Sequence, residues 1–277
     1  MLAFPGSMKF ASRLFGIASA LAGLLDLIWG EFEPAHQPIQ AWSDHIPGLG
    51  ALASIAAIWL IVGGLALLVR PAARAGAAAL AILYGIFCFF PLPRVISAPH
   101  YLGHHSAVYI GVLVGVAQQL IVFVAALLLW LYLGDHRQHS RLITVLARIL
   151  FGLCSIDFGL GHFTNISGTG EMIPTWMPGS GAFWTVVTGT AFLLAGMAIL
   201  TGLLDVLAAR LLGLMLLLFS ALVLTPRLFA APHSHVGWGG NAYNLTAVAA
   251  AWILAGWLER PYCAGSKYHS SVPSQAA

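Results

Sequence analysis

Charged residues are scarce in this 277-residue chain, since Asp, Glu, Lys and Arg together make up only 8% of it. Soluble domains carry about a quarter charged residues, so too few are present here to cover a water-facing surface. Three cysteines are also too few for a disulfide scaffold. The formal net charge is only +3 and the basic residues are scattered singly, so no nucleic-acid partner is expected.

Hydrophobic residues make up 60% of the chain and are gathered into long runs. A helix that crosses a bilayer needs roughly 20 mostly apolar residues. Eight runs approach or exceed this length, and they lack the alternation of a lipid-facing β-strand. They lie at residues 10–30, 49–69, 75–92, 107–133, 145–163, 181–202, 207–225 and 242–258. The sequence therefore predicts an all-α, polytopic membrane protein with eight transmembrane helices in a lipid bilayer.

The distribution of Lys and Arg predicts the orientation of these helices. With the N-terminus in the cytoplasm, all of the 12 basic residues except Arg94 and Arg227 fall on inner segments. Cytoplasmic segments carry the excess of Lys and Arg, so both termini are predicted to be cytoplasmic. Residues 259–277 are polar and are predicted to form a disordered cytoplasmic tail.

The chain also repeats itself. The pattern Pro-Arg-x-x-x-Ala-Pro-His occurs at residues 93–100 and again at 226–233, each time directly after an apolar run. This repetition predicts two four-helix units, residues 10–133 and 145–258, joined by a cytoplasmic linker at 134–144. Because four is an even number, both units have the same topology. Parallel repeats of this kind are related by an axis along the membrane normal.

The candidate ligand-binding residues are ionisable groups near the predicted outer ends of the runs. Charged groups in hydrocarbon are costly and usually face a bundle interior or a wet cavity. The candidates are Arg227, His233, His162 and Asp157 in the second unit, and Arg94, His100 and Asp26 in the first. Each set is expected to converge at the outer end of its own unit, and one alignment of the repeats places Asp26 opposite His162.

The two outer arginines have two interpretations. A guanidinium is a planar, permanently charged fork that can anchor a small anion or a polar head group. It can equally form a salt bridge, for which the nearest acids are Asp157 and Glu171 in the second unit. In the first unit they are Asp26 and Glu31. If Arg227 is buried in such a pair, replacing it with Ala is expected to cost roughly 3–5 kcal/mol.

Outer histidines supply imidazoles that suit zinc, copper or iron. The candidate metal ligands are His104, His105, His233 and His235. However, no H-x-x-x-H pair falls within a predicted helix, and the H-x-x-E-H and C-x-x-C spacings are absent. Hydrogen-bonded or free histidines are therefore favoured over a metal site, and no catalytic residue or cofactor is evident in the sequence.

The second unit resembles the DoxX-like family of small four-span bacterial membrane proteins. The resemblance rests on Gly161-His162-Phe163 at the end of a run, on the following loop 172–178, on a run of small residues and on the turn at Arg210. It covers residues 148–233, whereas family members are typically one unit and the first unit here lacks the Gly-His-Phe ending. The family includes a membrane subunit of a thiosulfate:quinone oxidoreductase. The resemblance therefore implies a bacterial cytoplasmic-membrane protein with a redox or quinone connection.

Two functions remain open from the sequence, and whether the protein is an enzyme stays undecided. The first is a component of a membrane redox system that binds a quinone-like or small anionic ligand at the outer face. Electrons would then come from a redox partner subunit, and a homo-oligomer is the other partner considered. The alternative is a non-enzymatic transporter, channel or assembly subunit, in which the same residues form a solute gate or hold the bundle together.

Overall fold

The computed structural model describes residues 8–33, 36, 47–134 and 140–259, and these are helical without any strand. The long helices are α1 (Met8–Trp29), α2 (Leu49–Leu68), α3 (Ala73–Phe87), α5 (Ser106–Tyr132), α6 (Arg141–Thr164), α8 (Gly181–Thr201), α9 (Asp205–Phe219) and α11 (His235–Leu258). The shorter ones are η2 (Arg70–Ala72), α4 (Arg94–Leu102), α7 (Ile166–Gly170), the π-helical η3 (Ser220–Leu224) and α10 (Thr225–Ala230). Each of the eight predicted runs therefore contains a helix.

Six helical segments are long and apolar enough to cross a membrane: α1, α2, α5, α6, α8 and the continuous stretch Asp205–Ala230. This composition is that of a multi-pass membrane protein. Helices α3 and α11 fall outside this set. Helix α3 has only 15 residues. Helix α11 is buried along nearly its whole length, so it needs few lipid-facing side chains and contains Asn, Thr and Ala instead.

Four predicted boundaries were wrong. The helix of the third run ends at Phe87 rather than at 92, because the prolines at 91 and 93 cannot continue its hydrogen bonding. Helix α6 begins at Arg141, inside the predicted linker. Its first turn lies before the apolar run, and a basic residue is tolerated there. Helix α11 begins at His235 rather than at 242, because the Ser234 hydroxyl caps its first turn by accepting from the backbone N–H of Gly237. The seventh run continues past Pro226, because that proline lies in the first turn of α10, where its missing N–H costs little. The rest of the linker at 135–139 and the tail at 260–277 lie outside the described residues.

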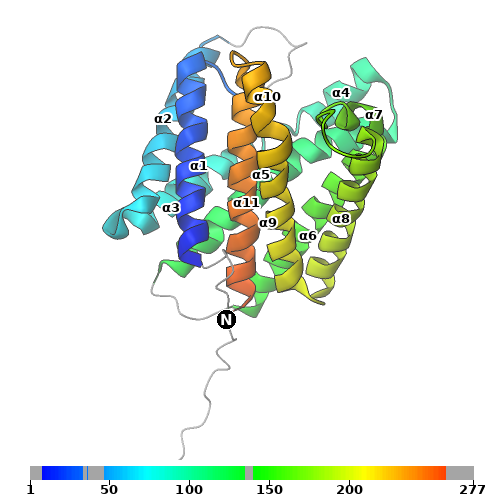
Figure 1. Cartoon of the computed structure of the whole chain (residues 1–277). Coiled ribbons are helices and arrows are strands. Elements are labelled where there is room, and N and C mark those ends of the chain that lie inside the picture. Colours follow the sequence, from blue (N-terminus) through cyan, green and yellow to red (C-terminus); the bar gives the residue numbers. More distant parts are fainter. Residues whose placement is uncertain (1–7, 34–35, 37–46, 135–139, 260–277) are drawn as a thin grey trace, which may run out of the picture.

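Figure 1 shows the long helices side by side in one bundle, and their pairwise contacts close into a ring. Its order is α1, α2, α3, α5, α6, α8, α9 and α11, after which α11 packs against α1. Helices α5 and α11 also pack against each other across the ring. Helix α1 therefore packs on α11, the last described helix, rather than on α5, and one hydrophobic core runs through residues 10–133 and 145–258. Met8 lies beside Gly256, so α1 begins at the end of the bundle where α11 finishes.

Glycines bring two helix pairs into close contact in the same way. In the α1–α2 pair, a Cβ on Gly64 would lie 2.4 Å from the Gly16 carbonyl oxygen. In the α6–α8 pair, a Cβ on Gly196 would lie 2.8 Å from the Gly152 carbonyl oxygen. Seven residues further along α1 and α6, the same type of contact recurs at Gly23 and at Gly159. Small residues let helix backbones approach closely, as is common between membrane helices.

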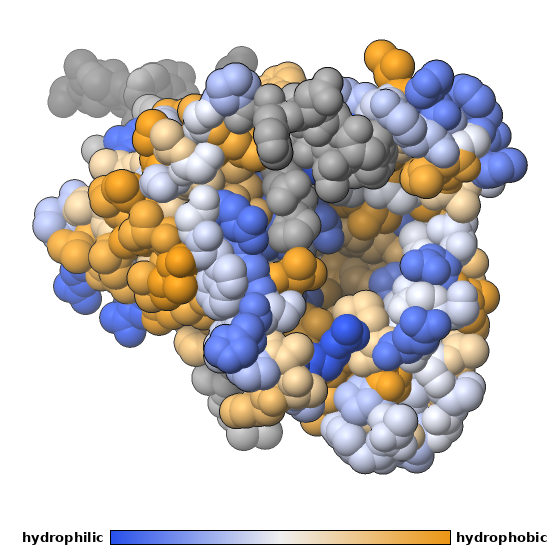
Figure 2. All heavy atoms as spheres, turned by 90° about the horizontal axis from the view of Figure 1, so that it is seen from above, coloured by the Kyte–Doolittle hydropathy of each residue, from blue (hydrophilic) through white to orange (hydrophobic). Residues whose placement is uncertain are grey.

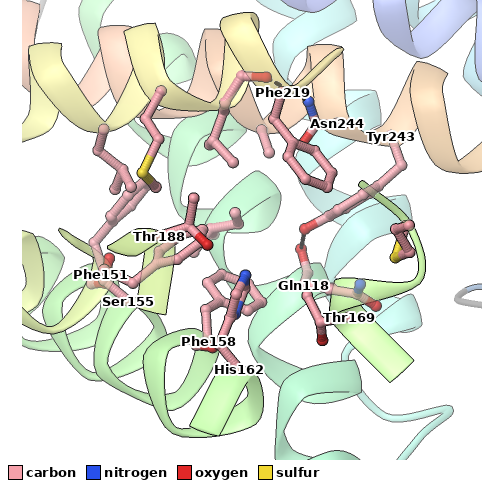
Figure 3. A pocket seen from close by; sticks show the side chains of 17 residues that line it. Gln118, Phe151, Ser155, Phe158, His162, Thr169, Thr188, Phe219, Tyr243 and Asn244 are labelled. Carbon is pink, nitrogen blue, oxygen red and sulfur yellow. Dashed lines mark hydrogen bonds between the residues drawn. The ribbon is translucent and has the colours of Figure 1, made fainter. Parts of the chain in front are cut away.

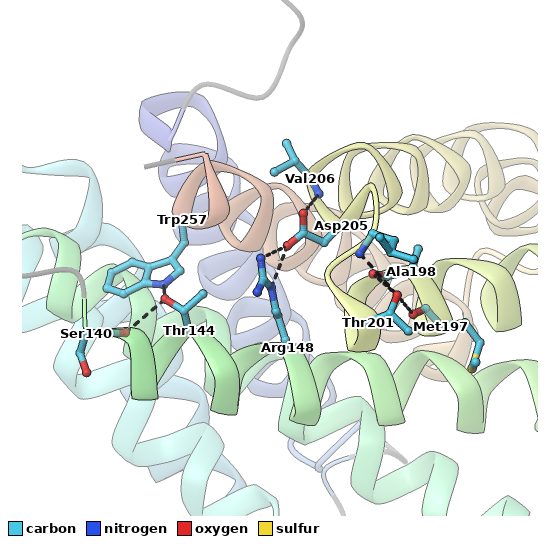
Figure 4. Close-up of polar contacts among 10 residues, drawn as sticks. Ser140, Thr144, Arg148, Met197, Ala198, Thr201, Asp205, Val206 and Trp257 are labelled. Carbon is cyan, nitrogen blue, oxygen red and sulfur yellow. Dashed lines mark hydrogen bonds and ion pairs between the residues drawn. The ribbon is translucent and has the colours of Figure 1, made fainter. Parts of the chain in front are cut away.

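Polar side chains join the helices at the end of the bundle that holds Met8 and Leu258 (Figure 4). The guanidinium of Arg148 on α6 forms an ion pair with Asp205, the first residue of α9, and its Nε donates to Oδ2 at 2.7 Å. The indole of Trp257 donates to Thr144 Oγ1 at 3.1 Å. These contacts fix α6 to both α9 and α11.

The close approach of α1 and α2 predicts that Gly64→Ala is destabilising. The added methyl group would overlap backbone atoms of α1, so we expect a loss of roughly 1–3 kcal/mol, measured as thermal unfolding in detergent. The matched control is Gly111→Ala on α5, where a Cβ meets nothing within 4 Å. Equal stability of the two variants would contradict the packing described for α1 and α2.

Candidate functional site

A cavity of about 240 Å³ lies between α5, α6, α8, α9 and α11, and we call it the central cavity (Figure 3). Most of its wall is apolar, with aromatic rings from Phe151, Phe158, Phe192 and Phe219. The polar groups in the wall come from several different helices: Gln118, Ser155, His162, Thr169, Thr188, Tyr243 and Asn244. An apolar pocket with a few converging polar groups is the usual form of a small-molecule site.

His162 presents a hydrogen-bond acceptor to this cavity. Its Nδ1 lies 2.8 Å from the carbonyl oxygen of Phe158 on the preceding turn of α6. A carbonyl can only accept, so Nδ1 carries the proton and the Nε2 lone pair is left for a ligand. Gly189 on α8 makes room for this arrangement, because a Cβ there would lie 2.9 Å from the Cβ of His162.

Gln118 on α5 lies opposite His162, and its side-chain amide makes no hydrogen bond to any described residue. Its backbone carbonyl accepts from the hydroxyl of Tyr243 at 3.0 Å, which fixes α5 to α11. Asn244, one residue further on, donates to the carbonyl of Leu216 at 2.8 Å, beside the π-helix that begins at Ser220. Gln118, Tyr243 and Asn244 are not among the candidate residues that the sequence suggested. The available signal was that uncharged polar residues stand within long apolar runs.

Two hollows continue from the central cavity toward the end of the bundle where α4, α7 and α10 lie (Figure 1). The first, of about 720 Å³, lies between α4, α5 and α6 and contains Arg94, so we call it the Arg94 groove. The second, of about 370 Å³, contains Glu33 and Arg227, and we call it the Arg227 recess. Gln118 lines all three spaces. Figure 2, which looks onto this end, shows the surface hollowed between hydrophilic side chains.

The outer arginines do not pair with the acids that the sequence suggested. Arg94 is half-buried, and this burial lowers the pKa of its guanidinium, while the negative charge of Glu33 acts in the opposite direction. Arg227 is exposed and makes no ion pair within the described residues. The predicted pairs with Asp26 or Glu31 and with Asp157 or Glu171 were therefore wrong. The physical reason in the first unit is that Asp26 and Glu31 both face His235.

The predicted convergence of each set within its own unit was also wrong. Arg94 and His162 come from different units, yet they line one groove, because α5 packs on α6. Asp26 faces α11 of the other unit for the same reason, since α1 packs on α11. Asp157 is half-buried on α6 and is not among the residues that line these three hollows.

The remaining histidine candidates lie elsewhere. His100 and His233 are exposed near the end of the bundle where α4 and α10 lie, and they line none of these hollows. His104 and His105 are exposed as well, and His104 Nδ1 lies 2.9 Å from the hydroxyl of Tyr109. His235 is buried against two carboxylates. Within the described ranges, no three His, Cys, Asp or Glu side chains are grouped closely enough to hold a metal ion.

Compared with protein-family models, with curated proteins and with solved structures, the chain matches none of them.

The exposed position of Arg227 leads to a prediction about stability. We expect Arg227→Ala to change the free energy of unfolding by less than about 0.5 kcal/mol, as is typical of a surface substitution. In contrast, Asp205→Ala is expected to cost about 1–3 kcal/mol, because it removes a charge-assisted hydrogen bond from Arg148. Thermal unfolding of both variants in detergent measures this difference. If Arg227→Ala instead lowers the free energy of unfolding by clearly more than this, Arg227 is part of a buried salt bridge, as the sequence suggested.

Proposed function

We propose that the chain is an integral membrane protein with eight spans in two parallel four-helix repeats. The matching glycine contacts of α1–α2 and α6–α8 support the repeats. The common end of Met8 and Gly256 supports an even number of spans. The basic residues Arg148 and Arg210 lie near that end, which by the positive-inside rule favours cytoplasmic termini. The DoxX-like resemblance implies that the membrane is a bacterial inner membrane.

We further propose that the central cavity binds the head group of a quinone-like lipid. One observation carries this proposal. The side-chain amide of Gln118 and the Nε2 atom of His162 both line the same apolar pocket, and both are available to bond a ligand. The amide N–H can donate to a ring carbonyl, and Nε2 can accept from a ring hydroxyl. A quinone has ring carbonyls when oxidised and ring hydroxyls when reduced, so it finds a hydrogen-bond partner here in both forms.

The Arg94 groove provides space for the apolar tail of such a ligand. It shares Gln118 and His162 with the central cavity, so head group and tail would be continuous. Its α5 wall contains Gly111, where a Cβ would meet nothing within 4 Å, and Gly115, where only Pro91 is near. Without side chains at these two positions, this wall is smooth enough for a chain of methyl or methylene groups to lie along it.

The redox part of this proposal comes from the DoxX-like resemblance. When bound, a quinone supplies the electron-accepting chemistry, and electrons would reach it from a partner subunit. The residues described here would bind and orient the ring and take part in proton exchange at His162 Nε2.

The proposal is tested by ligand binding to the purified full-length protein in detergent, followed by quenching of tryptophan fluorescence. The probes are a benzoquinone with a decyl tail and the same ring with a methyl group in place of the tail. We expect the tailed compound to bind at least about tenfold more tightly, because each buried methylene contributes about 0.8 kcal/mol and 1.4 kcal/mol is a factor of ten. Gly111→Leu should abolish this difference and leave binding of the tailless ring unchanged.

Gly240→Leu is the matched control, because Gly240 also faces open space but lines the Arg227 recess. It should preserve the advantage of the tail. Gln118→Leu should weaken binding of both compounds, since it removes the amide donor. Equal binding of both compounds to the wild type, or an unchanged tail effect in Gly111→Leu, would contradict the proposal. Competition by inorganic anions alone would instead favour the small-anion site at the arginines.

A further inference from the structure

A second group of ionisable side chains lies outside the central cavity, where the outer end of α1 meets the first turn of α11. Asp26 is 1% exposed and His235 is 5% exposed. Trp29 covers the imidazole of His235, with the two rings stacked at 5.0 Å and nearly parallel. Burial of two ionisable groups at this depth is costly unless they satisfy each other.

Both nitrogens of the His235 ring face carboxylates. Nε2 lies 3.1 Å from Asp26 Oδ1, and Nδ1 lies 3.2 Å from Glu31 Oε1. A neutral imidazole has one N–H and one lone pair, so it can donate to only one of them. Two arrangements satisfy all three groups: a charged imidazolium between two carboxylates, or a neutral imidazole with one carboxyl protonated. They differ by the movement of one proton along one hydrogen bond.

The two carboxylates differ strongly in their access to water. The side chain of Glu31 is 59% exposed, whereas that of Asp26 is 1% exposed. The imidazole of His235 therefore connects a carboxylate in the outer aqueous phase to one inside the protein. A histidine in this position can take up a proton at one nitrogen while it releases another proton from the other nitrogen.

We propose that Glu31, His235 and Asp26 form a proton relay between the outer surface and the protein interior. Glu31 takes a proton from water and passes it to Nδ1, while the Nε2 proton moves to Asp26, so that one proton is carried inward. The reverse steps release it. This relay does not depend on quinone binding.

Further titratable groups surround the inner end of the relay. The backbone N–H of Glu33 donates to Asp26 Oδ1 at 3.1 Å, and the Glu33 side chain lines the Arg227 recess. His36 Nδ1 lies 3.7 Å from Asp26 Oδ2. Burial by itself lowers the pKa of His36, but Asp26 and Glu33 outweigh burial, so this pKa is raised. On the α3 side, Tyr84 is engaged with Ser19, at 3.0 Å between the two oxygens. The inner carboxylate therefore lies next to a recess that continues into the central cavity.

Glu31 and His235 could instead form a structural clamp, meaning a contact that only holds the helices in place. Glu31→Gln distinguishes this clamp from a proton relay. The glutamine oxygen can still accept from Nδ1, so the contact is kept, but an amide cannot take up and release a proton. We therefore expect His235 to stay in place while its ring N–H protons exchange with water roughly 100-fold more slowly, the lower range for a positioned acid–base group. Nitrogen NMR of the full-length protein, labelled at histidine and held in detergent, measures this exchange, and His235→Gln assigns the signal.

Glu171→Gln is the matched control, because Glu171 is an exposed outer glutamate that makes no contact with His235. It should leave the exchange at His235 unchanged. Asp26→Asn keeps a hydrogen-bond partner for Nε2 but removes the group that takes up its proton, so exchange at Nε2 should also slow. If Asp26→Asn does not fold, Glu31→Gln still decides. Exchange as fast in Glu31→Gln as in the wild type would overturn the relay and leave a structural clamp.

Discussion

The enclosure of α11 by other helices is the constraint on which the rest of the structure depends. Helices α1, α5 and α9 pack around it, and its side chains are buried from Gly239 to Trp257 with few interruptions. A helix without lipid contact can carry polar residues, but each of them must find a partner inside the protein. Asn241 bonds to Ser220 and Thr225, and Asn244 bonds to the carbonyl of Leu216. These bonds hold α11 against the π-helical stretch η3.

The same helix supplies groups to both functional regions that we propose. Tyr243 and Asn244 line the central cavity, whereas His235, two turns earlier, reaches toward α1. The two regions are joined through Glu33, whose side chain lies against Gly239 and lines the Arg227 recess. A Cβ at Gly239 would lie 2.4 Å from the Glu33 side chain, so glycine is needed there for the acid to pack on α11.

Under the proposed repeat, the two halves of the chain differ at one matched position. The glycine contacts place Asp26 on α1 at the position that His162 occupies on α6. Around His162 the space is open and forms the central cavity. Around Asp26 the space is filled, because Tyr84 bonds to Ser19 and the ring of His36 stacks on Phe87 at 4.5 Å. One half therefore offers a ligand cavity, and the other holds a closed network of ionisable groups.

The sequence by itself determined the helical class and the approximate position of every long helix. Long apolar runs leave a backbone in lipid no alternative to helical hydrogen bonding, so composition is sufficient there. It also identified His162, Arg94 and Asp26 as unusual. It did not determine their partners, because every such prediction assumed that each four-helix unit closes on itself. Only the tertiary structure decided that α1 packs on α11 and α5 on α6, which pairs Asp26 with His235 and brings Arg94 to the groove of His162. Apolar helix faces specify burial but not the neighbour, and the neighbour is selected by glycine contacts and polar bonds between residues far apart in the chain.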